Sequence, residues 1–234
     1  MANFQKAHNK YLSCVAADGM QWMSADFKTA QKIVSAGEGG YANDPDDTGG
    51  ETYKGIARKF HPQWLGWKIV DAYKMKHGAL KNNEKIPDSY LDNEVEKYYK
   101  MIFWNFVGGD DIKSQEVANI VYDAYVNQTG WTRKMLEDSL SQNGKKVSVR
   151  IPLKTDVISA INSVPASDFY NDFKAQRKKR YEQRAREVPG QQKFLAGWMN
   201  RLSHFDNKLL ETVQANQGKT AIILVGLGLL ATGI

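Results

Sequence analysis

Cysteine, proline and histidine are all scarce in this sequence. Of 234 residues, one is cysteine, six are proline and four are histidine. The single Cys14 cannot form a disulfide within the chain, so the fold must be stable without one. The histidines show no ligand spacing, and we expect neither a metal site nor a cofactor. No long apolar stretch follows a basic start at the N-terminus, so a cleaved secretory signal is not expected.

The composition that is present is globular, with a moderate basic excess. Apolar residues make up 42% of the chain and charged residues 25%, and the formal net charge is +6. This charge favours an anionic partner, a class that includes nucleic acid, anionic membranes and bacterial cell walls. Seven basic residues fall within 174–186, which is either a solvated helix face or a surface attracted to wall polymer or lipid headgroups. No aromatic platform or recognition motif accompanies them, so nucleic acid is not the expected partner.

Hydrophobic periodicity predicts a mainly α protein. Apolar residues recur at helical spacing over 27–36, behind a cap at Ser24, and again over 88–106. Within 88–106 the residues expected to face inward are Leu91, Val95, Tyr98, Tyr99, Ile102, Phe103 and Phe106. Further helices are expected over residues 114–127, 131–142, 154–163, 167–188 and 191–213.

The segments between these helices are less regular. Residues 37–55 are rich in Gly, Asp, Asn and Pro, which predicts a loop, tight turns or a small hairpin. Short helices are expected over 56–60 and 64–73. The alternating segment KKVSVRIPL, residues 145–153, predicts a brief extended piece. The expected class is therefore mainly α with a small β or irregular element around an acidic loop.

That acidic loop, AGEGGYANDPDDTGGETYKGI (residues 36–56), allows three interpretations. A calcium loop starting at Asp44 would need a bidentate Glu at its twelfth position, which is Gly55, so this interpretation fails. Asx-rich structural turns fit the residue types. A glycosidase pair also fits, because sugar hydrolysis needs one protonated and one ionised carboxyl group.

Two carboxyl groups suit such a pair. Glu38 follows an apolar helix, where partial burial would raise its pKa and keep it protonated. Asp47 lies in a polar turn and can stay ionised. Gly39 and Gly40 carry no side chain, which would leave room for a bulky polymer beside Glu38.

Three motifs in this order resemble glycoside hydrolase family 108, the N-acetylmuramidases of phages and prophages. The first is EGGYANDPDDTGGETYKGI, which begins at Glu38. The second is VYDAYVNQTGW, residues 121–131, and the third is QQKFLAGWMNRL, residues 191–202. The resemblance covers about residues 27–205. It implies a lysozyme-like α+β fold with a small hairpin at the active site, a helical C-terminal half, and hydrolysis of the β-1,4 bond between N-acetylmuramic acid and N-acetylglucosamine.

The resemblance also implies roles for individual residues. Glu38 would be the general acid, and Asp47, nine positions on, the second carboxylate, helped by Thr52. Asp44 is a rival for the second carboxylate. Tyr41, Asp44 and Tyr53 are expected to bind substrate, which would be the glycan strands of peptidoglycan at the bacterial cell wall. Inversion and retention of the anomeric centre both remain open.

Two alternatives also remain open. If Asp47 points away, Glu38 could act alone, as in lytic transglycosylases, where a hydroxyl of the sugar attacks. The chain could also be a non-catalytic wall-binding or virion protein with the same fold. The C-terminal half lacks most of the Asp-Gly-x-x-Gly-Pro-x-Thr loop that is common in the family, which weakens the prediction of wall binding there.

The resemblance divides the chain into four parts. Residues 1–26 are an N-terminal extension, 27–112 a lysozyme-like catalytic region, 113–213 a helical peptidoglycan-binding region, and 214–234 an apolar tail. Residues 221–234 contain no charge. As a helix they would reach only about 21 Å, whereas a bilayer core is about 30 Å thick. We therefore expect the tail to dock in a membrane or in a virion protein, or to pack on its own core.

Overall fold

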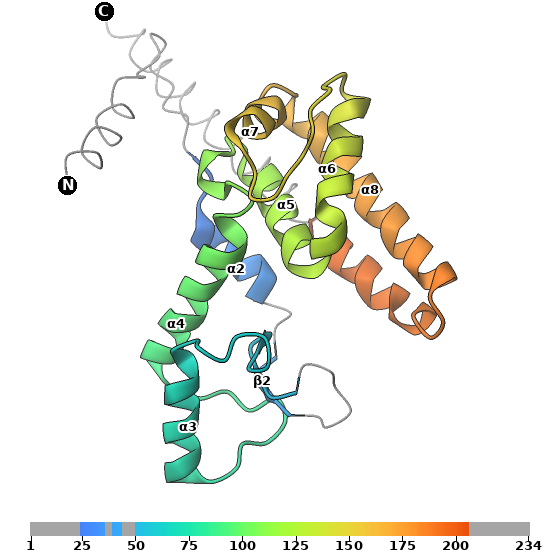
Figure 1. Ribbon diagram of the computed structural model, residues 1–234. Coiled ribbons are helices and arrows are strands. Elements are labelled where there is room, and N and C mark those ends of the chain that lie inside the picture. The colour runs from blue at the N-terminus through green and yellow to red at the C-terminus, as the bar shows by residue number, and fades with distance from the viewer. Residues whose placement is uncertain (1–23, 36–38, 44–49, 206–234) are drawn as a thin grey trace, which may run out of the picture.

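A computed structural model describes residues 24–35, 39–43 and 50–205, and these residues are mostly helical (Figure 1). A three-stranded antiparallel sheet consists of β1 (Tyr41–Ala42), β2 (Thr52–Tyr53) and β3 (Ile56–Ala57) in that order. Residues 195–205 are helical as well. The other α-helices are α2 (Phe27–Ser35), α3 (Gly66–His77), α4 (Ser89–Tyr99), α5 (Gln115–Asn127), α6 (Thr129–Gln142), α7 (Thr155–Asn162) and α8 (Ala166–Glu187).

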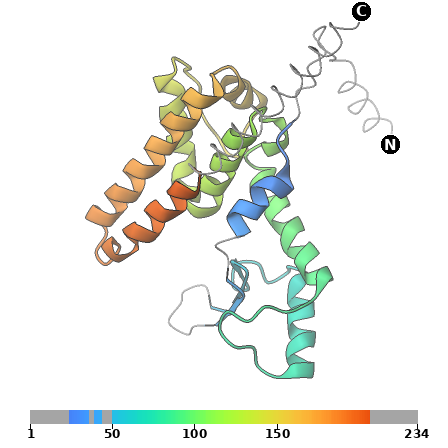
Figure 2. The same cartoon turned by 180° about the vertical axis from the view of Figure 1, so that it is seen from behind.

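The elements form two lobes, as Figures 1 and 2 show from opposite sides. The sheet and α3 form one lobe, while α5, α6, α7 and α8 form the other. Helix α4 runs from the first lobe to the second, and α2 packs against α5 with its C-terminal end directed toward the sheet. One continuous cluster of buried apolar side chains extends from Ala25 to Phe205. The part of the chain that precedes the sheet and the part that follows it therefore share one hydrophobic core.

Helix α2 begins and ends close to its predicted bounds, but its cap differs from the prediction. The Asp26 carboxylate, not Ser24, accepts the Thr29 backbone N–H at 2.7 Å. Asp suits this position because its short side chain reaches back to the free amides of the first turn. Phe27, Ala30 and Val34 are buried, as their helical spacing predicts.

The predicted helix over 56–60 is wrong, because Ile56–Ala57 is the strand β3. Lys54 and Gly55 both adopt left-handed backbone angles, with φ of 44° and 78°. Two consecutive residues with positive φ form the two-residue turn whose twist matches paired strands. The chain therefore reverses after β2 and pairs Tyr53 with Ile56.

Helix α4 is predicted correctly at its start, where the Asp88 side chain accepts the Leu91 backbone N–H at 2.9 Å. Beyond Tyr99 it continues as a π-helical turn over Lys100–Trp104. The wider turn shifts the helical register. As a result Trp104 is completely buried, although the sequence pattern did not place it inward, while Phe106 is half-buried.

The second lobe follows the predicted helices closely. Helices α5, α6, α7 and α8 each begin or end within about two residues of the expected bounds. No strand occurs in 145–153, so the extended piece predicted there pairs with nothing in the sheet. None of the helices in the described part of the chain is long and apolar enough to cross a membrane. The predicted helix 191–213 is described only to residue 205, and the tail 221–234 lies outside the described residues.

Candidate active site

The predicted general acid lies between two described elements. Helix α2 ends at Ser35 and the described chain resumes at Gly39, so Glu38 itself lies outside the described residues. Asp44 and Asp47 fall within 44–49, which is likewise outside them. The structure therefore fixes the helix before Glu38 and both strands that flank the acidic turn. The roles of the three carboxyl groups stay predictions.

Gly40 holds the start of the sheet against the segment that precedes α4. The Gly40 N–H donates to the Asn83 side chain at 2.8 Å, and the Tyr41 N–H donates to the Glu84 carbonyl at 2.8 Å. A Cβ atom built on Gly40 would lie 2.2 Å from the Glu84 carbonyl oxygen. Glycine is thus required here by the close approach of two backbone segments, a reason different from the space for a polymer that the sequence suggested.

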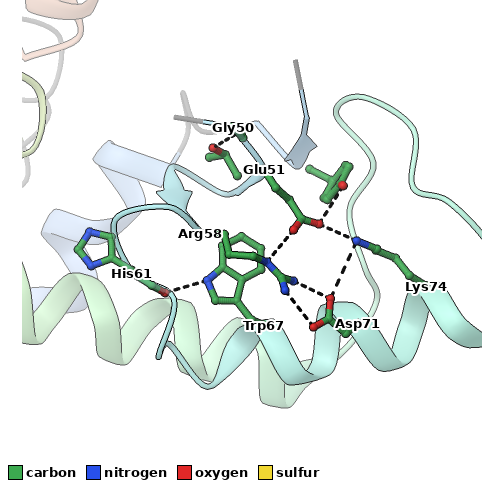
Figure 3. A network of polar contacts seen from close by, with 9 residues as sticks. Gly50, Glu51, Arg58, His61, Trp67, Asp71 and Lys74 are labelled. Atoms are coloured by element: carbon green, nitrogen blue, oxygen red, sulfur yellow. Dashed lines mark hydrogen bonds and ion pairs between the residues drawn. The ribbon is translucent and has the colours of Figure 1, made fainter. Parts of the chain in front are cut away.

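A network of charged side chains anchors the sheet on α3 (Figure 3). At its centre is the Glu51 carboxylate, which accepts the Tyr41 hydroxyl at 2.9 Å and Lys74 Nζ at 2.7 Å. Arg58 Nε lies 2.6 Å from the other Glu51 oxygen in an ion pair. Glu51 is therefore saturated by its neighbours and is not a free carboxylate for catalysis.

Arg58 extends this network to α3. Its two terminal nitrogens donate to both oxygens of Asp71, at 3.0 and 2.6 Å, and its guanidinium lies 4.4 Å from the ring centre of Trp67. The hydrogen bonds from Arg58 lower the pKa of Asp71, and the hydrogen bond to Glu51 raises the pKa of Lys74. This network was not predicted from the sequence. The i, i+3 pair Asp71 and Lys74 on one helix was the available signal.

The two tyrosines that were expected to bind substrate point into the first lobe. Tyr53 is completely buried, and its hydroxyl accepts the Ile86 backbone N–H at 3.1 Å. Tyr41 is 6% exposed, and burial followed by the hydrogen bond to Glu51 raises the pKa of its hydroxyl. In this conformation both rings support the sheet from within.

Thr52 is the one predicted catalytic residue that the structure describes. It is half-buried in β2, opposite Ala42 and Ala57 in the two neighbouring strands. Its hydroxyl donates to the Gly50 carbonyl at 3.1 Å, which joins it to the end of the acidic turn. The hydroxyl is thus held by a main-chain contact beside the segment that contains Asp47.

Two cavities flank α2 near its C-terminal end. The larger, about 330 Å³, lies on the α4 side and is lined by Gln31, Ser35, Lys54, Lys85, Asp92, Val95, Glu96 and Tyr99. The smaller, about 180 Å³, lies on the α5 side and is lined by Ile33, Asp123, Gly197, Asn200, Arg201, His204 and Phe205. Both place polar and charged side chains beside the helix that leads to Glu38.

A buried ionic cluster, here called the Asp123 cluster, joins three helices beside the smaller cavity. Asp123 on α5 is 1% exposed and accepts Arg177 on α8 at 2.7 Å and Arg201 on the last helix at 3.1 Å. Burial by itself lowers the pKa of Arg177, but the charge and hydrogen bond of Asp123 raise it overall. The basic run 174–186 is therefore not uniformly solvated, because Arg177 is completely buried. Asp123 lies in the motif of residues 121–131 and Arg201 in the motif of residues 191–202, and this was the signal from which their pairing could have been predicted.

Groups of three or more His, Cys, Asp or Glu side chains placed to hold a metal ion do not occur in residues 24–35, 39–43 and 50–205.

Comparison with known proteins agrees with the resemblance in the sequence. Residues 31–129 match the family described as Glycosyl hydrolase 108, a span that runs from within α2 to the start of α6. The structure of Brucella abortus SagA is similar with a TM-score of 0.53 and 21% sequence identity, over 79% of this chain and 94% of that chain. No curated protein matches the chain. The expected lysozyme-like α+β fold with a mostly helical chain and a small antiparallel sheet is confirmed.

Proposed function

We propose that the chain is an N-acetylmuramidase acting on peptidoglycan, because its residues 31–129 match the family described as Glycosyl hydrolase 108. The observation that carries the proposal is the family match over 31–129, which includes Glu38, the acidic turn and the sheet. The bond cleaved would be the β-1,4 bond between N-acetylmuramic acid and N-acetylglucosamine, and the place of action the bacterial cell wall.

In this proposal Glu38 donates a proton to the bridging oxygen as the bond to the sugar carbon breaks. Asp47 accepts a proton from the water whose oxygen attacks that carbon, and Thr52 orients the water or the carboxylate. The hydroxyl of Thr52 supports this role because it is fixed next to the acidic turn. A separation of about 6.5–9.5 Å between the carboxyl groups would invert the sugar carbon, and about 5 Å would retain it.

The predicted substrate-binding residues take different parts in the proposal. Asp44 remains the rival second carboxylate or a ligand of the sugar. Tyr41 and Tyr53 would shape the cleft indirectly, since their rings pack inside the first lobe.

The test is the release of new ends from purified peptidoglycan. Glu38→Gln removes the proton donor while keeping the shape of the side chain, so hydrolysis should fall by about 10²–10⁴. Glu182→Gln is the matched control, because Glu182 lies on α8 and pairs with Lys178 at 3.9 Å. Full lysis by the Glu38→Gln protein would overturn the assignment. Asp47→Asn should be severe and Asp44→Asn milder, and the reverse order would make Asp44 the second carboxylate.

The chemical nature of the new ends separates the alternatives. Reducing N-acetylmuramic acid ends are expected for the proposed hydrolase. Anhydro ends would instead indicate a lytic transglycosylase that uses Glu38 alone. No new ends from wild-type protein that still binds the wall would indicate a non-catalytic binding protein.

We further propose that residues 221–234 tether the enzyme to a membrane or a virion, as their uncharged composition suggests. A phage or prophage origin would fit either partner. Deletion of these residues should abolish membrane or particle association while turnover on soluble fragments is unchanged. Unfolding of the shortened protein would show instead that the tail is part of the core.

A further inference from the structure

The turn between α8 and the last helix projects from the helical lobe. Figures 1 and 2 show these two helices as an antiparallel pair, in orange and red, whose connecting turn extends beyond α5 and α6. Helix α8 ends at Glu187, and a short 3₁₀ turn over Gln192–Phe194 starts the return. Residues 184–194, here called the hairpin tip, therefore form a projecting end of the molecule.

Two large apolar side chains are exposed on the hairpin tip. Val188 is 38% exposed and Phe194 is 46% exposed. Phe194 is the outer member of a row of rings, because its ring centre lies 6.1 Å from that of Trp198, which stacks on Tyr181 at 5.2 Å. Tyr181 is only 4% exposed, so the row reaches from the core to the surface. The Phe194 ring is thus supported from beneath while its outer part faces solvent.

The turn that carries these side chains is held in one shape by its own contacts. Arg184 Nε donates to the Gln191 side-chain oxygen at 3.2 Å, and the Val188 N–H donates to the Arg184 carbonyl at 3.0 Å. Gly190 has a φ of 78°, a left-handed angle that glycine adopts without strain where the chain reverses. A partner can therefore contact Val188 and Phe194 without first rearranging the turn.

Cations surround the exposed apolar side chains. Lys193 Nζ lies 5.0 Å from the ring centre of Phe194. Arg184 and Arg186 are exposed in the last turn of α8. Glu187 is the one acidic residue of the hairpin tip, which contains three basic residues and therefore has a net charge of +2. The tip thus combines apolar side chains with positive charge.

This combination suits the surface of an anionic lipid bilayer. Aromatic and aliphatic side chains enter the region of the headgroups, and neighbouring Lys and Arg are attracted to the negative surface. Single-stranded polymers are typically held in a charged groove, and small ligands in a concave pocket. A projecting tip instead fits a flat surface.

We propose that the hairpin tip docks on an anionic phospholipid membrane. Phe194 and Val188 enter the headgroup region of the bilayer. Their neighbours Arg184, Arg186 and Lys193 contact the lipid phosphates. The contact places the helical lobe at the membrane without any part for residues 221–234, and it does not depend on the proposed hydrolysis of peptidoglycan.

Cosedimentation of the full chain with lipid vesicles tests this proposal. Vesicles of phosphatidylcholine alone are compared with vesicles of phosphatidylcholine and phosphatidylglycerol in equal amounts. Each of the three cations should strengthen partitioning into the anionic vesicles by about fivefold, so their combined effect is about a hundredfold. Added salt should weaken this binding, because it screens the charges. Residues 221–234 contain no charge and would bind both kinds of vesicle alike.

Substitution of the exposed ring separates docking by the tip from general attraction. Phe194→Ala should weaken partitioning into the anionic vesicles by about tenfold, because it removes the apolar contact. Phe194→Trp should preserve it, because an indole ring also suits the membrane interface. Phe60→Ala is the matched control, since Phe60 is 63% exposed in the first lobe and Lys59 Nζ lies 5.9 Å from its ring centre. It should bind as the wild type does.

Charge variants are paired in the same way. Arg186→Gln and Lys193→Gln should each weaken partitioning into the anionic vesicles by about fivefold. Lys59→Gln changes the net charge by the same amount in the first lobe and should leave partitioning within about twofold of the wild type. All three side chains are exposed, so these variants should fold, which circular dichroism checks.

Equal binding of the wild type to the two kinds of vesicle would overturn the proposal, as would equal losses in Phe194→Ala and Phe60→Ala. Equal losses in Lys193→Gln and Lys59→Gln would show that net charge alone attracts the protein, and would also overturn it. A polymer would be the partner instead if the tip variants reduced sedimentation with purified peptidoglycan or binding to nucleic acid while their binding to anionic vesicles stayed unchanged.

Discussion

Two glycines show at the scale of single residues how differently the same amino acid is used. A Cβ atom added to Gly40 would lie 2.2 Å from the Glu84 carbonyl oxygen, whereas a Cβ atom added to Gly130 in α6 would have no neighbour within 4 Å. Gly40→Ala should therefore lower the free energy of unfolding by about 2–4 kcal/mol, because two backbone segments must separate. Gly130→Ala should raise it by about 0.5–1 kcal/mol, because alanine loses less entropy in a helix.

Urea denaturation of both variants checks this contrast. If Gly40→Ala is as stable as the wild type, the contact between β1 and the segment before α4 does not constrain residue 40.

Ionisation of Tyr98 is expected to lower the stability of the fold at alkaline pH. Its ring is 7% exposed, and burial raises its pKa from 10.0 to about 12. A phenol with a higher pKa in the folded state contributes stability that is complete below pH 10 and is lost as the pH rises toward 12. Tyr98→Phe cannot ionise, so its stability should fall less over this range, by about 1–3 kcal/mol.

The measurement is the melting temperature from neutral pH to pH 12. Tyr90→Phe is the control, because Tyr90 is 76% exposed, and it should follow the wild type. Tyr98→Phe is also expected to lose some stability at neutral pH, since the Tyr98 hydroxyl lies 2.7 Å from His61 Nε2. Identical alkaline losses in Tyr98→Phe and wild type would contradict the assignment.

At the scale of elements, the side chain of Arg58 connects the sheet to α3. Arg58→Lys keeps the charge but loses the two-pronged contact with Asp71 and the stacking on Trp67. We expect a loss of about 1–2 kcal/mol in the free energy of unfolding. Arg133→Lys, in an exposed pair with Glu137, should change it by less than about 0.5 kcal/mol.

The same network predicts an acid sensitivity with a definite direction. Because the pKa of Asp71 is lowered in the folded state, its contribution is present above its ordinary pKa of 3.8 and is lost as the pH falls below that value. The stability difference between wild type and Arg58→Lys should therefore shrink at acid pH. A difference that is constant from neutral pH to pH 2 would show that packing on Trp67, and not the ion pair, accounts for it.

At the scale of the whole molecule, the Asp123 cluster joins α5, α8 and the last helix. Asp123→Asn leaves two arginines near an uncharged group, one of them completely buried. Removing one partner from a buried ion pair typically costs about 3–5 kcal/mol. Asp138→Asn, which removes an exposed partner of Lys134 on α6, should cost less than about 1 kcal/mol.

Chemical denaturation followed by circular dichroism and by tryptophan fluorescence tests this prediction. Trp198 lies on the last helix and is one of six tryptophans, so the difference in fluorescence between the protein and its Trp198→Phe form reports whether that helix separates first. An Asp123→Asn protein as stable as Asp138→Asn would show that the cluster is not what holds these helices together.

The sequence alone determined the regular part of this protein. Helices α2, α5, α6, α7 and α8 were predicted within a few residues, because each buries one apolar stripe whose spacing is visible in the chain. The resemblance to family 108 and the lysozyme-like fold were also apparent from three ordered motifs, and the comparisons confirm both. The roles of Glu38, Asp44, Asp47 and Thr52 were predicted by the same route and remain to be tested.

Tertiary structure decided what depends on contacts between distant residues. The strand at Ile56–Ala57 was mistaken for a helix because two left-handed residues, Lys54 and Gly55, set the chain direction. Trp104 is buried because a π-helical turn shifts the register after Tyr99. Local apolar spacing cannot show either effect. Nor could it show that Arg177, within a basic run, is buried against Asp123 from 54 residues earlier in the chain, since a charge is stable in the interior only beside a partner that the fold supplies.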